Sequence, residues 1–145
     1  MDEFDRRLLS LLARDATLTY AALGEKLHLS APAVHERVKR LKRAGVIKST
    51  VAVLDGPKVG RPLLAFIHVT KRDWRMTEQM QRLAELPEVE EIHTVTGDCA
   101  MVLKVRVSDS QALGALIARM HTVEGCETTR SYIALSSYLE RGPQP

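Results

Sequence analysis

The chain has 145 residues, of which 45% are apolar and 27% charged, the composition of a globular protein with one ordinary domain or two small ones. No apolar run reaches the roughly 20 residues of a membrane helix, and the acidic N-terminus is unlike a secretory signal, so we expect a cytoplasmic protein. Two distant cysteines and five histidines without ligand spacing exclude a zinc site and a disulfide framework, and no cofactor is expected.

Positive charge is concentrated in the first third of the chain. Residues 1–50 contain ten Lys and Arg against six Asp and Glu, whereas the remaining residues contain 11 basic and 12 acidic ones. Six of these basic residues fall between Arg37 and Lys48. This distribution predicts an N-terminal module that binds a polyanion and a nearly neutral C-terminal module with another role.

A first amphipathic helix is predicted over residues 3–14. Asp2 is followed three residues later by Asp5, which resembles a capping box with Asp in place of the usual Glu or Gln. Apolar side chains then recur at helical spacing: Phe4, Leu8, Leu11 and Leu12.

A helix-turn-helix is predicted to follow. Thr19 is a suitable N-cap for a helix over 20–27. Ser30 caps a third helix, which Gly45 ends in a left-handed conformation. About three residues join these two helices, which is the spacing of a helix-turn-helix.

The third helix separates an apolar stripe from a charged face. Val34, Val38 and Leu41 fall at i, i+4 and i+7, so they are predicted to be buried. The other positions are predicted to be solvated and mainly basic: His35, Glu36, Lys39, Arg40, Lys42 and Arg43.

A wing and a hinge are predicted to connect the two modules. Residues 46–53 favour a small β element, and residues 55–62 are dense in turn formers. We therefore divide the chain into a winged helix-turn-helix domain, a linker strand and hinge, a second domain and a tail, at residues 1–50, 51–62, 63–140 and 141–145.

The second domain is predicted to be ferredoxin-like, with the order β-α-β-β-α-β and the fold class α+β. Its strands are expected at 63–70, 89–96, 101–107 and 126–139, and its helices at 75–86 and 109–121. Gly97-Asp98 is expected to be a tight turn, and Trp74 to pack at an interface or a strand end. Both helices would cover one face of a four-stranded antiparallel sheet, which predicts that a partner subunit covers the other face.

Three stretches of the sequence carry a resemblance to a known family. These are Asp2–Leu9, Leu29–Leu41 followed by Ala44–Ile47, and Thr96-Gly97-Asp98 before an apolar strand. In this order and spacing they resemble the Lrp/AsnC family, the feast/famine regulators, over roughly the whole chain. The resemblance implies dimers formed through the C-terminal sheet, often assembled into octamers. It also implies amino acid effectors that bind between subunits and change assembly or DNA affinity.

The candidate DNA-binding residues lie on and beside the third helix. Its N-terminal half is expected in the major groove, where small side chains approach the bases and His35 meets a base edge. Phosphate contacts would come from the cations, although Arg37 has the alternative of an internal ion pair with Glu36 or Asp55. The complete set is Ser30, Ala31, Ala33, His35, Glu36, Arg37, Lys39, Arg40, Lys42 and Lys48.

The Gly97-Asp98 turn is the candidate effector site, and an ordinary hairpin turn is its plain alternative. The resemblance favours a ligand role, in which free backbone N–H groups of such a turn can bind a carboxylate and Asp98 can meet an ammonium group. The flanking residues are small, which favours an apolar effector such as leucine or methionine: Thr94, Thr96, Cys99 and Ala100.

Two other functions fit parts of the sequence. A siroheme decarboxylase would share the architecture, but residues 64–71 lack the His-, Arg- and Tyr-rich run expected of that group. No nucleophile–base pair appears, so we expect no enzyme. An architectural DNA-binding protein without an effector fits residues 1–50 equally well, and saturable ligand binding would distinguish a sensor from it. We predict a sequence-specific transcriptional regulator.

Overall fold

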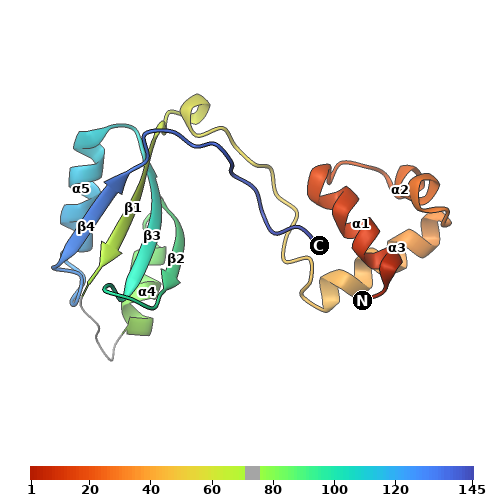
Figure 1. The fold of residues 1–145 in the computed structure, drawn as a ribbon, viewed down its shortest axis with the longest axis horizontal. Coiled ribbons are helices and arrows are strands. Elements are labelled where there is room, and N and C mark those ends of the chain that lie inside the picture. The colour runs from red at the N-terminus through yellow and green to blue at the C-terminus, as the bar shows by residue number, and fades with distance from the viewer. Residues whose placement is uncertain (71–75) are drawn as a thin grey trace. The chain divides into compact units, whose positions relative to one another are not determined.

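The chain forms two compact units, each with its own apolar core. The computed structural model describes residues 1–70 and 76–145, so Trp74 and the expected helix start at Arg75 lie outside the described residues. One unit comprises Met1–Val53 with Leu139–Pro145, and the other comprises Leu54–Tyr138 (Figure 1).

Three helices form the first unit: α1 (Glu3–Arg14), α2 (Tyr20–Leu27) and α3 (Ala31–Arg43). The predicted caps are confirmed, because the side chains of Asp2, Thr19 and Ser30 each accept a hydrogen bond from a backbone N–H of the following first turn. One apolar cluster joins the helices: Leu8, Leu23, Leu27, Val34, Val38 and Leu41.

The turn between α2 and α3 depends on a close backbone approach. The Leu29 N–H donates to the Gly24 carbonyl at 2.9 Å, and His28 has a left-handed backbone with φ 56°. A Cβ atom at Gly24 would overlap the carbonyl oxygen of Leu29. The turn therefore requires a glycine at this position of α2.

The end of α3 confirms the predicted left-handed cap. Gly45 has φ 70°, its N–H donates to the Lys42 carbonyl at 3.0 Å, and the Val46 N–H donates to the Leu41 carbonyl at 3.0 Å. The β element predicted over 46–53 is wrong, since this segment forms no strand. Strands need neighbours for their backbone hydrogen bonds, and the four strands of the described residues pair among themselves.

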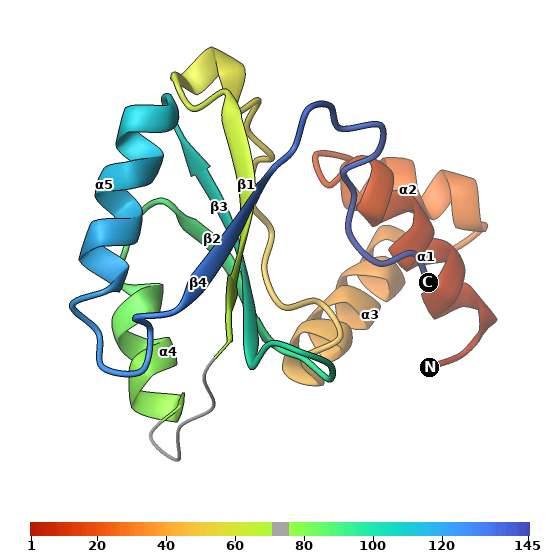
Figure 2. The same ribbon diagram turned by 60° about the vertical axis from the view of Figure 1, so that its left-hand side comes forward.

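The second unit contains β1 (Leu63–Val69), α4 (Met76–Ala84), β2 (Val89–Thr94), β3 (Met101–Val107), α5 (Ser110–Met120) and β4 (Thr129–Ile133). The strands lie in the order β2-β3-β1-β4, and each neighbouring pair is antiparallel. Both helices cover the same face of this sheet (Figure 2). The predicted α+β class and ferredoxin-like order are confirmed.

The two faces of the sheet differ in composition. On the helix side, alternate residues of β1 and β3 enter the core, among them Ile67 and Leu103. On the outer face, Phe66 pairs with Tyr132, and the rings of His68 and Tyr132 lie 4.7 Å apart. Phe66 and Tyr132 are 37% and 52% exposed, so this face keeps aromatic side chains in contact with solvent.

Two predicted boundaries of the sheet are wrong. The last strand, β4, spans Thr129–Ile133 and is shorter than the predicted 126–139. Its neighbour β1 begins at Leu63, so the hydrogen bonds between the two strands end with the one from the Ala134 N–H to the Leu64 carbonyl. Before that strand, Cys126 packs into the core. The expected tight turn is instead a six-residue connection, 95–100, between β2 and β3.

We predict that Gly24→Ala lowers the free energy of unfolding by about 1–3 kcal/mol, because the added methyl group displaces the Leu29 carbonyl. Thermal unfolding followed by circular dichroism measures this change. The control is Gly114→Ala on α5, where a Cβ atom meets nothing within 4 Å. The control should raise stability by about 0.5–1 kcal/mol, as alanine does in an open helical site. Equal midpoints for the two variants would contradict the prediction.

Candidate DNA interface and effector turn

The helix α3 carries its side chains on three faces. Val34, Val38 and Leu41 are buried in the core of the first unit, as predicted. Arg37 and Arg40 form ion pairs with carboxylates of the α1 N-terminus. The remaining face is exposed and mainly basic: His35, Glu36, Lys39, Lys42 and Arg43.

A buried carboxylate joins α1 to α3. Asp5 is 1% exposed, and its side chain accepts a hydrogen bond from the Asp2 N–H at 3.0 Å. It also accepts hydrogen bonds from two arginines of α3. Arg37 Nη1 lies 2.8 Å from one carboxylate oxygen, and Arg40 Nη2 lies 2.8 Å from both. Arg37 Nη1 also donates to Asp2 Oδ2 at 2.7 Å. We call Asp2, Asp5, Arg37 and Arg40 the Asp5 cluster.

The Asp5 cluster holds its carboxylates in the charged form. Burial raises the pKa of Asp5, but the Asp2 backbone hydrogen bond and the two guanidinium groups outweigh it, so the pKa lies below its ordinary value. The hydrogen bond from Arg37 likewise lowers the pKa of Asp2. Arg37 also lies over the Phe4 ring, 5.4 Å from its centroid. Two cations of α3 are thus neutralised by two anions of α1.

The structure separates the predicted DNA-binding residues into those paired within the protein and those exposed to solvent. Arg37 is paired within the protein, with Asp2 and Asp5 rather than with Glu36 or Asp55. Lys39 is 55% exposed and lies 4.0 Å from Glu36. Ser30 uses its hydroxyl as the N-cap, and the Ala31 and Ala33 side chains of the first turn are partly exposed. Lys42 and Lys48 are exposed, and no ion pair within residues 1–70 and 76–145 engages them.

Tyr20 is a neighbour of His35 that sequence reasoning missed. It is the first residue of α2, and its ring centroid lies 5.2 Å from that of His35 at an interplanar angle of 40°. His35 is half-exposed and also lies 3.8 Å from a Glu36 oxygen. The residues that could have indicated this contact are 15 positions apart in the sequence, so no local pattern marks it.

The candidate effector residues lie at the end of β2 and in the β2–β3 connection. Thr94, Thr96, Gly97 and Asp98 are exposed, whereas Cys99 and Ala100 are buried. The Ala100 N–H is used in a 2.7 Å hydrogen bond to the Val69 carbonyl.

The backbone of Gly97 and the side chain of Asp98 are the two features of this turn that bear on ligand binding. Gly97 has φ 124°, a conformation that favours glycine. Asp98 Oδ2 lies 3.8 Å from Arg130 Nη1, and both side chains are mostly exposed. Arg130 was not predicted; it is brought here by the β1–β4 register, which pairs it with His68. An anion and a cation therefore stand together at the turn.

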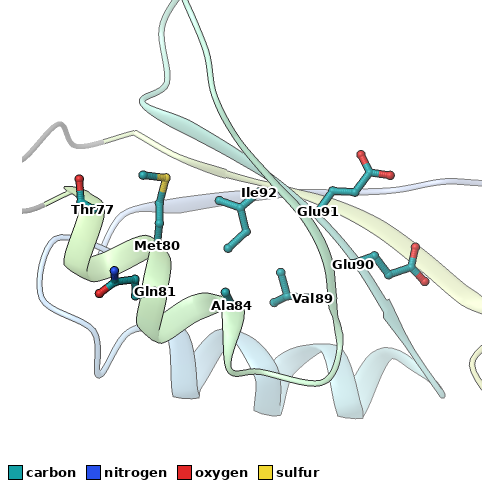
Figure 3. A pocket seen from close by; sticks show the side chains of 8 residues that line it. All are labelled: Thr77, Met80, Gln81, Ala84, Val89, Glu90, Glu91 and Ile92. Carbon is teal, nitrogen blue, oxygen red and sulfur yellow. The ribbon is translucent and has the colours of Figure 1, made fainter. Parts of the chain in front are cut away.

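A separate groove of about 460 Å³ lies between α4 and β2. Figure 3 shows Met80 and Ala84 of α4 facing Val89 and Ile92 of β2. A bulge between Val89 and Glu91 turns both apolar strand residues toward the helix. None of the six predicted effector residues lines this groove.

Two family models match the chain. An AsnC-type helix-turn-helix domain matches residues 1–42, and an Lrp/AsnC ligand binding domain matches residues 64–144.

Across residues 1–70 and 76–145, no helix is both long enough and apolar enough to cross a membrane.

Curated relatives and solved structures agree with these models. The HTH-type transcriptional regulator FL11 of Pyrococcus furiosus is 30% identical over 100% of this chain and 96% of its own length. LrpA of Mycobacterium tuberculosis is 34% identical, with 97% and 95% covered. An AsnC family regulator from Agrobacterium tumefaciens has a TM-score of 0.93 at 29% identity, with 100% and 97% covered.

A further structural relative was solved with a bound amino acid. It is a transcriptional regulator of Neisseria meningitidis in complex with L-Met, with a TM-score of 0.92, 25% identity, and 100% and 96% covered. The family models together span both units, and the relatives span the chain from end to end. The chain therefore belongs to the Lrp/AsnC family, as a transcriptional regulator with a helix-turn-helix DNA-binding domain and a ligand-binding domain.

Proposed function

We propose that the chain is a sequence-specific regulator that reads DNA with the exposed face of α3, assembles into dimers and octamers through its C-terminal domain, and binds an apolar amino acid. The observation that carries the proposal is the composition of that face. His35, Lys39 and Lys42 stand exposed on a capped helix at helix-turn-helix spacing. A helix with this exposure fits the major groove of B-DNA.

The base-reading part of the proposal rests on the first half of α3. Ala31 and Ala33 are small and partly exposed, so they permit close approach to base edges and thymine methyl groups. His35 and Glu36 follow on the exposed side, with hydrogen-bonding groups. The ring of Tyr20 beside His35 restricts where the imidazole can point. The cations Lys39, Lys42 and Lys48 would then hold the domain on the phosphates.

The effector part rests on the exposed turn. Asp98 and Arg130 offer an anion and a cation, which are the partners of the ammonium and carboxylate groups of a free amino acid. The two buried residues of the connection, Cys99 and Ala100, are small and apolar. The L-Met complex of the Neisseria meningitidis relative supports an amino acid as the ligand class.

The assembly part rests on exposed apolar side chains of the second unit. The outer sheet face carries Phe66 and Tyr132, and beyond β4 the side chains of Leu135 and Tyr138 are 98% and 97% exposed. Apolar surface of this kind is typical of an interface between subunits. A second copy of the chain would cover it.

We predict that Lys39→Ala and Lys42→Ala each weaken binding to every duplex. Loss of one phosphate contact makes the slope of log K against log salt concentration less steep by about 0.9. Fluorescence anisotropy across a salt series measures the slope on both a random duplex and the chain's own upstream DNA. Unchanged affinity in both variants would show that this face of α3 does not meet DNA. Lys58→Ala, an exposed lysine of the other unit, is the control.

We predict that His35→Ala changes sequence preference with little change in the salt slope. A side chain that contacts a base edge contributes about 1–3 kcal/mol of discrimination, whereas phosphate contacts stay in place. Selection of bound sequences from a random pool, by the wild type and by the variant, measures the change. Identical selected motifs would rule out base contact by His35.

We predict saturable binding of leucine or methionine that Asp98→Asn abolishes, because the variant lacks the anion for the ammonium group. Isothermal titration calorimetry measures the binding, and sedimentation of the same samples reports any change of assembly. Glu85→Gln, which removes an exposed carboxylate elsewhere, should bind as the wild type does. Absence of heat with all common amino acids would favour an architectural DNA-binding protein.

A further inference from the structure

The cations of α3 fall into two classes that the sequence does not distinguish. Arg37 and Arg40 have the same charge as Lys39 and Lys42, yet both arginines are hydrogen-bonded to the buried Asp5, whereas Lys39 lies only 4.0 Å from the exposed Glu36. Arg37 is only 22% exposed on its side chain, and Arg40 is 58% exposed. The difference follows from position on α3, because Arg37 and Arg40 are three residues apart and share the face that meets the carboxylates of α1.

The acceptor in this contact is saturated. A carboxylate offers about four lone-pair sites. Asp5 accepts four hydrogen bonds: one from the Asp2 N–H, one from Arg37 and two from Arg40 Nη2. Because its backbone N–H also donates to Asp2 Oδ1 at 2.8 Å, the capping box fixes the Asp5 side chain in this orientation. Asp5 is therefore a preorganised acceptor for two guanidinium groups.

Pairing of this kind reduces the number of cations that are available to the phosphates of a DNA duplex. Each cation that neutralises a phosphate releases counterions, and this release supplies essentially all non-specific affinity. A guanidinium held by a buried carboxylate is less available for that role, and the carboxylate cancels part of its field. Fewer available cations lower the affinity for arbitrary DNA, and specificity is the ratio of specific to arbitrary affinity.

We propose that Asp5 is a positioning residue for DNA binding, which holds Arg37 and Arg40 against α1 and so limits the non-specific affinity of the α3 surface. The inference rests on the proposed DNA-reading role of α3 and adds a determinant outside the DNA-contacting surface. Asp2 assists through its contact with Arg37.

The test uses three full-length variants that each remove one negative charge. Asp5→Asn removes the shared acceptor. Asp2→Ser removes one Arg37 contact and keeps a residue that caps helices well. Glu3→Gln is the matched control, since Glu3 is exposed in the same turn of α1 and lies outside the Asp5 cluster. Anisotropy on a short random duplex across a salt series gives affinity and slope, and circular dichroism checks folding.

The proposal predicts a graded result. Asp5→Asn should steepen the salt slope by about 0.9 for each arginine that gains a phosphate contact, up to about 1.8 per subunit. It should also bind random DNA several-fold more tightly, and the ratio of upstream to random affinity should fall. Asp2→Ser should lie between Asp5→Asn and Glu3→Gln, and Glu3→Gln should stay close to the wild-type slope.

Each outcome decides one question. Folded variants with slopes equal to that of Glu3→Gln would overturn the proposed role of Asp5. If Asp5→Asn fails to fold, Asp2→Ser against Glu3→Gln decides, and equal slopes again overturn the proposal. A wild-type chain that does not bind duplex DNA at all would instead overturn the proposed function of α3.

Discussion

A carboxylate removed from water requires cations or donors around it, and this requirement organises the first unit. Asp5 meets it with two arginines from a helix that lies 32 and 35 positions further along the chain. The same contact joins the N-terminus of α1 to the middle of α3. Since the apolar stripe of α3 faces the core, Arg37 and Arg40 face α1, and Lys39, Lys42 and Arg43 are left for solvent. The contacts of one buried carboxylate thus orient the surface that we propose for DNA binding.

In the second unit, the two faces of one sheet offer different surfaces. Its helix-covered face is closed by a continuous apolar core. Its outer face combines aromatic side chains with charged ones: Lys104 lies 3.4 Å from Glu90, and Arg106 lies 2.8 Å from it. Under the proposed assembly, such a mixture would offer apolar contact to a second subunit. The candidate effector turn connects two strands of this same sheet, β2 and β3.

The sequence correctly predicted the features that depend on residues close together in the chain. Helix bounds in the first unit follow from Asp2, Thr19 and Ser30, because a cap and the N–H that it accepts are only three residues apart. The wing and the ends of the last strand were predicted wrongly, because β-formers become a strand only where a neighbour supplies hydrogen bonds. The partners of Arg37 and the approach of Arg130 to Asp98 were missed for a related reason: both join distant segments through tertiary packing.

The two cysteines give the second unit a property of its own. Cys126 is fully buried in the core, where burial, and secondarily the charge of Glu127, raises the pKa of its thiol. Cys99 is 5% exposed, and both cysteines belong to Leu54–Tyr138. Thiolates rather than thiols react with alkylating reagents. Alkylation of the native protein is therefore limited by opening of the sheet domain. The alkylation rate reports the local stability of that domain. The rate does not report unfolding of the three-helix unit, which contains no cysteine.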